Sequence, residues 1–176
     1  MRQEKLIAPP DFVTAARIPL AAAFVLFDGL GARLLILAAT GLSDVVDGIW
    51  ARRVGGSRVG AVLDPVCDKL FMAAAFWVVW RSAALGVFEI LAALLRDIVA
   101  FLSFITVSIR GRPTTLPARA GGKAVSIAQV LILVAFVADS DLIRPLAWAT
   151  GAISLYAIAD YSRVALTSSQ RESADQ

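Results

Sequence analysis

Hydrophobic positions along the chain gather into long runs that short polar segments separate. A helix needs about 20 mostly apolar residues to cross the hydrocarbon core of a bilayer. Six candidate runs lie at residues 12–30, 34–52, 60–80, 86–109, 124–138 and 142–161. Glycine-containing turn signals separate several of these runs, for example at residues 28–31 and 55–57. The pattern predicts an all-α, polytopic integral membrane protein with six transmembrane helices, although charged residues interrupt most of the runs.

The composition agrees with this prediction and narrows the chemistry. Hydrophobic residues make up 59% of the chain and charged residues only 18%, whereas soluble domains average roughly 45–50% and about 25%. The chain has no histidine and one cysteine. This excludes a histidine general base, a histidine-ligated zinc site and an intramolecular disulfide. The net charge of +3 is too small to indicate binding to nucleic acid.

Basic residues in the predicted connections indicate how the helices are oriented. Lys and Arg are concentrated near both ends of the chain and in the connections around residues 52–58 and 110–123. Because Lys and Arg favour the cytoplasmic face of a membrane, both termini and these two connections are predicted to be cytoplasmic. We therefore expect a multi-pass protein of the cytoplasmic (inner) cell membrane whose active site faces the cytoplasm.

The expected domain organisation is simple. Residues 1–11 form a short cytoplasmic N-terminal segment, and residues 12–165 form the six-helix transmembrane domain that carries any catalytic site. Residues 166–176 are polar and lack periodicity, so they are predicted to be a disordered tail.

Four aspartates are concentrated in one predicted helical hairpin. Asp44 and Asp47 are three residues apart, and Asp64 and Asp68 are four apart, so each pair lies on one face of its helix. The short connection makes the helices antiparallel neighbours, so the two pairs can face each other. Converging carboxylates repel unless cations intervene, and ligation by oxygen alone suits Mg²⁺, Mn²⁺ or Ca²⁺. Four acids are enough for two divalent ions, an arrangement suited to phosphoryl displacement.

Small residues and an arginine accompany these acids. Gly48 and Gly60 leave room where the two helices come closest, and the small side chain of Ala51 leaves space on the same face. Arg52 is placed to bind a phosphate through two parallel hydrogen bonds. Two other interpretations of the acids stay open at this point, namely salt-bridged packing and the cation pathway of a small divalent-cation transporter.

Together these residues resemble the signature of the CDP-alcohol phosphatidyltransferase family. The pattern is complete at eight positions, which are Asp44, Asp47, Gly48, Ala51, Arg52, Gly60, Asp64 and Asp68. The resemblance implies that the four aspartates hold two divalent metal ions, Mg²⁺ or Mn²⁺. It also implies that Gly48, Ala51, Arg52 and Gly60 line the CDP and diphosphate site. Asp68 would act as the general base that takes the proton of the acceptor hydroxyl.

The same resemblance implies substrates and surroundings. The donor would be CDP-diacylglycerol, the acceptor an alcohol, and the released product CMP. The enzyme would lie in a lipid bilayer and form a homodimer.

A second segment bears on the acceptor. Gly122-Lys123-x-x-Ser126-x-x-Gln129 is similar to a Gly-Lys-x-x-Thr-x-x-Gln pattern of phosphatidylglycerophosphate and cardiolipin synthase members. Ser126 replaces the threonine, and Val125 stands where the former commonly have a second lysine. Lys123 is the first candidate for binding an acceptor phosphate. Further basic candidates are Arg110, Arg112, Arg119 and Arg163.

The acceptor itself stays open between three alcohols. Glycerol 3-phosphate is the first choice because of the basic candidates, and it would make the product phosphatidylglycerophosphate. Phosphatidylglycerol, as in a cardiolipin synthase, is the second choice. Inositol phosphate or a related alcohol, as in phosphatidylinositol (phosphate) synthesis, is the third. The basic residues could also reflect only the excess of positive charge on the cytoplasmic side.

The charged residues inside the predicted spans include three whose role stays open between two interpretations. Arg17 either extends toward the cytoplasmic interface or faces a polar cavity. Arg96 and Asp97 are expected to find partners on other helices, in a buried structural pairing or in a substrate role.

Overall fold

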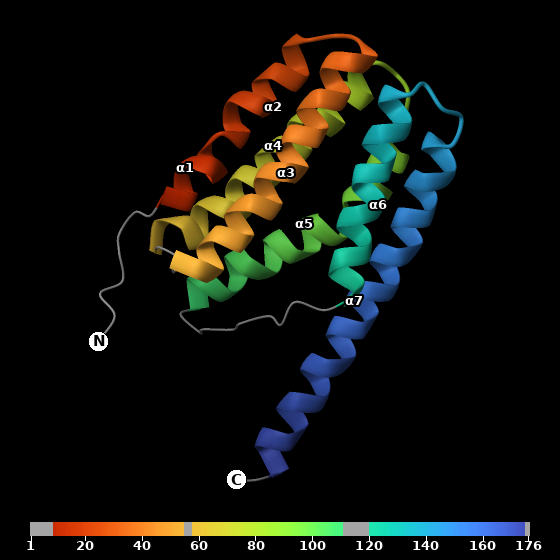
Figure 1. Ribbon diagram of the computed structural model, residues 1–176. Helices are drawn as coiled ribbons and strands as arrows, with labels where there is room; N and C mark the ends of the chain where they lie inside the picture. Colours follow the sequence, from red (N-terminus) through yellow and green to blue (C-terminus); the bar gives the residue numbers. More distant parts are fainter. Residues whose placement is uncertain (1–8, 55–57, 111–119, 175–176) are drawn as a thin grey trace. The chain divides into compact units, whose positions relative to one another are not determined.

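The computed structural model describes residues 9–54, 58–110 and 120–174, and these residues form helices without any strand. This confirms the all-α class (Figure 1). The helices are α1 (Pro9–Ala15), α2 (Arg17–Leu26), α3 (Leu30–Val54), α4 (Arg58–Arg81), α5 (Val87–Arg110), α6 (Ala120–Val137) and α7 (Ile143–Ala174). Helix α7 therefore continues through most of the segment whose composition predicts disorder.

The first predicted run is divided between α1 and α2, which meet at Ala16. The carbonyl of Ala15 would normally accept a hydrogen bond from the residue four positions later, but that residue is Pro19, which has no N–H. The backbone N–H of Leu20 still bonds to the carbonyl of Ala16 at 3.3 Å. The chain thus keeps its direction across one missing helical hydrogen bond.

Helices α1 to α4 belong to one of two compact units of the chain, together with residues 136–139. Within this unit, α1 and α2 each pack against both α3 and α4. The core includes Phe24 of α2 and Phe71 of α4, whose rings meet edge to face with centroids 5.9 Å apart. The two helices α3 and α4 therefore share α1 and α2 as packing partners.

An arginine at the start of α3 ties residues 136–139 to this unit. The guanidinium of Arg33 lies over the rings of Phe24 and Phe136, with 5.5 and 5.4 Å to the ring centroids. Its Nη2 also donates to Asp28 Oδ1 at 2.6 Å. Gly29, which follows Asp28, has a φ of 110° that glycine adopts without steric cost, and this residue allows the turn into α3.

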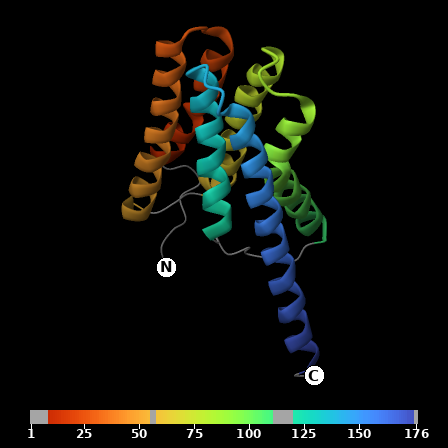
Figure 2. The ribbon, with the colours of Figure 1, turned by 90° about the vertical axis from the view of Figure 1, so that its right-hand side faces the viewer.

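Residues 83–135 and 140–176 form the second unit, which contains α5, most of α6 and α7. Figure 2 shows α7 running beside α6, and α5 packs against α7. A Cβ atom added at Gly151 of α7 would lie 2.9 Å from the Cβ of Ala92 of α5. The side chains of Ala147 and Thr150 are fully buried in the same helix. Small residues thus allow α5 and α7 to approach closely.

The helices of residues 9–54, 58–110 and 120–174 do not support the transmembrane part of the prediction. Among the described residues, no helix is both long enough and apolar enough to cross a bilayer. Charged residues lower the hydropathy of the runs from which the spans were predicted, as Asp44 in α3, Asp68 in α4 and Arg96 in α5 illustrate.

Candidate active site

All eight signature residues lie in two consecutive helices of the first unit. Residues 44–52 belong to α3, and residues 60–68 belong to α4. The helical placement that their spacing predicts is therefore present in the backbone. Six of the eight side chains lie outside the described residues, namely those of Asp47, Gly48, Ala51, Arg52, Gly60 and Asp64.

Asp44 is held by an arginine that the signature does not contain. Nη2 of Arg17, the first residue of α2, donates to Oδ1 of Asp44 at 2.9 Å. The Arg17 side chain is only 1% exposed, whereas the Asp44 side chain is 67% exposed. Burial of a guanidinium is costly without a counter-charge, and Asp44 supplies one. The other carboxylate oxygen of Asp44 is not used by this ion pair.

This contact decides between the two interpretations of Arg17. The burial of its side chain excludes an extension to a membrane interface, and its partner is a signature aspartate. The sequence left the role of Arg17 open, because the pair joins residues that are 27 positions apart. The available signal was a single arginine inside an otherwise apolar run.

Asp68, the predicted general base, lies in α4 and is exposed. Its neighbour Cys67 is fully buried in the core. The thiol therefore packs within the unit, while the carboxylate remains accessible from outside it. An exposed carboxylate can reach the hydroxyl of a bound alcohol, which is a geometric requirement for a general base.

The predicted metal site has only carboxylate oxygens as side-chain donors. Among the described side chains, no group of three or more carboxylates or thiols lies close enough to hold a metal ion. Asp44 and Asp68 are described, but the side chains of Asp47 and Asp64 are not. Carboxylate oxygens without histidine or cysteine fit Mg²⁺ or Mn²⁺. The two-metal site therefore stays a prediction.

In the second unit, residues 122–129, which the sequence links to acceptor binding, lie in the first turns of α6. Lys123 is exposed and therefore accessible to a ligand. Ser126 Oγ donates to the carbonyl of Gly122 at 3.2 Å, a bond within its own helix. Arg112 and Arg119 lie outside the described residues, and so do the side chains of Arg110 and Arg163.

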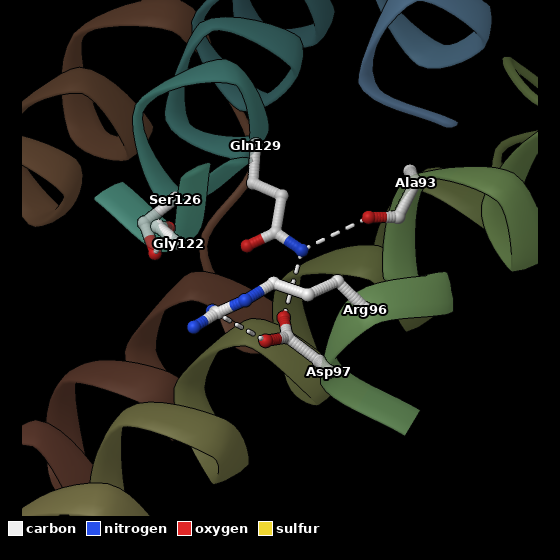
Figure 3. A network of polar contacts seen from close by, with 6 residues as sticks. All are labelled: Ala93, Arg96, Asp97, Gly122, Ser126 and Gln129. Atoms are coloured by element: carbon white, nitrogen blue, oxygen red, sulfur yellow. Dashed lines mark hydrogen bonds and ion pairs between the residues drawn. The ribbon is translucent and has the colours of Figure 1, made fainter. Parts of the chain in front are cut away.

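Gln129 of α6 connects this segment to the charged pair of α5. Its Nε2 donates to the carbonyl of Ala93 at 2.9 Å and to Oδ2 of Asp97 at 2.7 Å (Figure 3). Nη1 of Arg96 lies 3.4 Å from Oδ1 of the same carboxylate. The prediction that this pair finds a partner on another helix is confirmed for Asp97. Sequence reasoning assigned no contact to Gln129, although an amide in an apolar helix indicates a buried polar partner.

The comparisons with known proteins agree with the signature. Residues 7–159 match the model of the CDP-alcohol phosphatidyltransferase family. The chain belongs to this family. The matched region contains the signature of α3 and α4 as well as Lys123 and Gln129. Members of this family are transferases of phosphate-containing groups.

Two mycobacterial relatives carry a more specific name. Proteins from Mycobacterium bovis and Mycobacterium tuberculosis, each named "Putative cardiolipin synthase", are 34% identical to this chain over 79 residues. The aligned stretch covers 41% of this chain and 37% of each relative. The chain therefore aligns with less than half the length of the curated relatives it matches.

Proposed function

We propose that this protein transfers a phosphatidyl group from CDP-diacylglycerol to glycerol 3-phosphate and releases CMP. The observation that carries the proposal is the family match together with a complete signature on α3 and α4. The exposed Lys123 supports an acceptor that bears a phosphate. The name of the mycobacterial relatives favours a second candidate, in which phosphatidylglycerol is the acceptor and cardiolipin the product.

The donor diphosphate would bind at the signature residues. The aspartates at positions 44, 47, 64 and 68 would hold two divalent cations, Mg²⁺ or Mn²⁺, which would neutralise the negative charge of the diphosphate. Arg17 would keep Asp44 oriented through their 2.9 Å ion pair. Arg52 would bind a phosphate oxygen of CDP, and the small residues Gly48, Ala51 and Gly60 would leave space for it.

Asp68 would take the proton of the acceptor hydroxyl. The acceptor oxygen then forms a bond to the phosphorus nearest the lipid, and the bond from that phosphorus to the CMP oxygen breaks. CMP leaves with the electron pair of this bond, and Asp68 returns its proton to solvent. The exposure of Asp68 supports this role, because both the hydroxyl and water must reach the carboxylate.

We further propose that the protein works in the cytoplasmic membrane as a homodimer, with its site facing the cytoplasm. The donor is a lipid, and each unit exposes large apolar side chains, as extended membrane-binding surfaces do. In the first unit Trp77 and Trp80 are 43% and 52% exposed, and in the second Phe88 and Phe101 are 79% and 57% exposed. Binding to vesicles that contain CDP-diacylglycerol, measured by flotation, tests the membrane assignment.

An acceptor screen tests the proposed reaction. The purified chain in detergent with Mg²⁺ is given CDP-diacylglycerol and, separately, glycerol 3-phosphate, phosphatidylglycerol or inositol phosphate, and CMP release is measured. Release with glycerol 3-phosphate supports the first candidate, and release only with phosphatidylglycerol supports the second. If no acceptor yields CMP while the protein moves divalent cations across vesicle membranes, the four aspartates belong to a transporter instead.

A further inference from the structure

A buried polar network in the second unit lies beside the guanidinium of Arg96, which has no role in the site described above (Figure 3). Gln129 and Asp97 are almost fully buried, at 2% and 7% exposure. The amide nitrogen of Gln129 contacts two acceptors at once, the carbonyl of Ala93 and Oδ2 of Asp97, at 2.9 and 2.7 Å. Both hydrogens of that amide are therefore used, and the Asp97 carboxylate is fixed between α5 and α6.

The carboxylate holds Arg96 only weakly. Their closest approach is 3.4 Å, from Nη1 to Oδ1, whereas a strong pair between guanidinium and carboxylate has two bonds of about 2.7–2.9 Å. Nε of Arg96 is buried and has no hydrogen-bond partner among the residues that the structure describes. The Arg96 side chain keeps 22% of its surface exposed.

Gly122 leaves the space in which the Arg96 guanidinium lies. A Cβ atom added at this buried glycine would be 2.5 Å from Nη2 of Arg96 and 3.1 Å from Cζ. The guanidinium therefore occupies the space that any other residue at position 122 would fill. The next residue is the exposed Lys123. The Arg96 guanidinium therefore lies against the first turn of α6, the turn that also carries the exposed Lys123.

We propose that Arg96 binds a phosphate group of the acceptor, and that Asp97 and Gln129 are positioning residues that aim its guanidinium. The identity of the anion as the acceptor's phosphate rests on the proposed function. The fork of a guanidinium matches two oxygens of one phosphate, and the neighbouring lysine adds a second positive charge. The phosphate is a monoester in glycerol 3-phosphate and a diester in phosphatidylglycerol.

Steady-state kinetics of the full chain in detergent test this assignment. Arg96→Lys keeps the charge but loses the fork, and Gln129→Met keeps the volume but loses both donors. We expect each variant to raise the KM for the acceptor about tenfold or more, while kcat changes less than about threefold. The KM for CDP-diacylglycerol should not change. A purely structural role would instead lower thermal stability and kcat without a selective effect on one substrate.

Gly122→Ala provides a third perturbation, because it displaces the guanidinium without changing any charge. Gly31→Ala is its matched control, since a Cβ at that helical glycine meets nothing within 4 Å. Arg144→Lys is the control for Arg96→Lys, since Arg144 is 66% exposed and lies 3.9 Å from its partner Glu89. Both controls should retain wild-type KM values. Acceptor KM values within about twofold of wild type for both Arg96→Lys and Gly122→Ala would overturn the proposal.

Further measurements distinguish the two possible sources of the phosphate. They also separate a failure of this assignment from a failure of the proposed function. If the variants selectively raise the KM for glycerol 3-phosphate, Arg96 binds a phosphate monoester. If they selectively raise the KM for phosphatidylglycerol, Arg96 binds a phosphate diester. If no acceptor yields CMP, the proposed function fails. Binding of inorganic phosphate then tests by itself whether Arg96 forms an anion site. A phosphate-induced rise in unfolding temperature that Arg96→Lys abolishes supports the anion site. An equal rise in both proteins contradicts it.

Discussion

The ion pair between Arg17 and Asp44 leads to a prediction that separates stability from activity. Replacing Arg17 with Met keeps most of the buried volume and removes the donor that contacts Asp44 Oδ1 at 2.9 Å. A hydrogen bond to a charged group contributes about 1.5–3 kcal/mol to stability. However, Asp44 is 67% exposed, and pairs that water screens contribute about 0.2–1 kcal/mol.

The removal of a buried charge also recovers its desolvation cost. We therefore expect Arg17→Met to lower the free energy of unfolding by about 1 kcal/mol or less. Activity should respond more strongly, because loss of a residue that orients a metal ligand typically costs about 10–100-fold in metal affinity. The Mg²⁺ concentration for half-maximal CMP release should rise by about that factor.

The assay is a Mg²⁺ titration of CMP release for the wild type, Arg17→Met and the control Arg144→Met, with thermal unfolding followed by circular dichroism. The control removes an exposed arginine whose ion pair is 3.9 Å long. The reasoning is refuted if Arg17→Met has the same Mg²⁺ midpoint as the control. It is equally refuted if the unfolded fraction of Arg17→Met accounts for the whole change in the Mg²⁺ midpoint.

Three further predictions follow from other parts of the chain. Asp68→Asn should lower the rate of CMP release about 100-fold or more while the helical content is unchanged, because an amide cannot accept the acceptor proton; retention of full activity would show that another group is the base. A chelator should abolish CMP release, and added Mg²⁺ or Mn²⁺ should restore it; activity that persists in the chelator would contradict the two-metal site. Gly151→Val should lower the free energy of unfolding by about 1–3 kcal/mol, because even a Cβ would lie 2.9 Å from the Cβ of Ala92; thermal unfolding at or above the wild-type temperature would mean that α5 and α7 do not pack as described.

The sequence was sufficient to predict the helices, because their signals are local. Apolar runs of helical length and glycine-containing turns placed α3, α4 and α5 within a few residues of their positions in the structure. The interruption at Ala16 was missed, since it arises from one absent hydrogen bond at Pro19 rather than from a change in hydropathy. The transmembrane prediction combined apolar runs with the distribution of basic residues in the connections, but no described helix is long and apolar enough to cross a bilayer.

The sequence could predict only those residues of the candidate site that recur at a fixed spacing along the chain. The aspartates at 44, 47, 64 and 68 recur at helical intervals, so the signature could be read without a structure. The partners of Arg17 and Gln129 could not, because each contact joins positions 27 to 36 apart in the chain. Such contacts depend on how helices pack, which local patterns do not specify.

The most direct test of the central claim is the fate of CDP-diacylglycerol labelled in its cytidine. The wild-type chain and Asp68→Asn are incubated with this lipid, Mg²⁺ and glycerol 3-phosphate or phosphatidylglycerol, and the water-soluble label is identified. The account predicts that the wild type releases labelled CMP only when an acceptor is present, with an equal amount of new phospholipid, and that Asp68→Asn releases almost none. Intact CDP-diacylglycerol after incubation with the folded wild-type chain and each acceptor would contradict it.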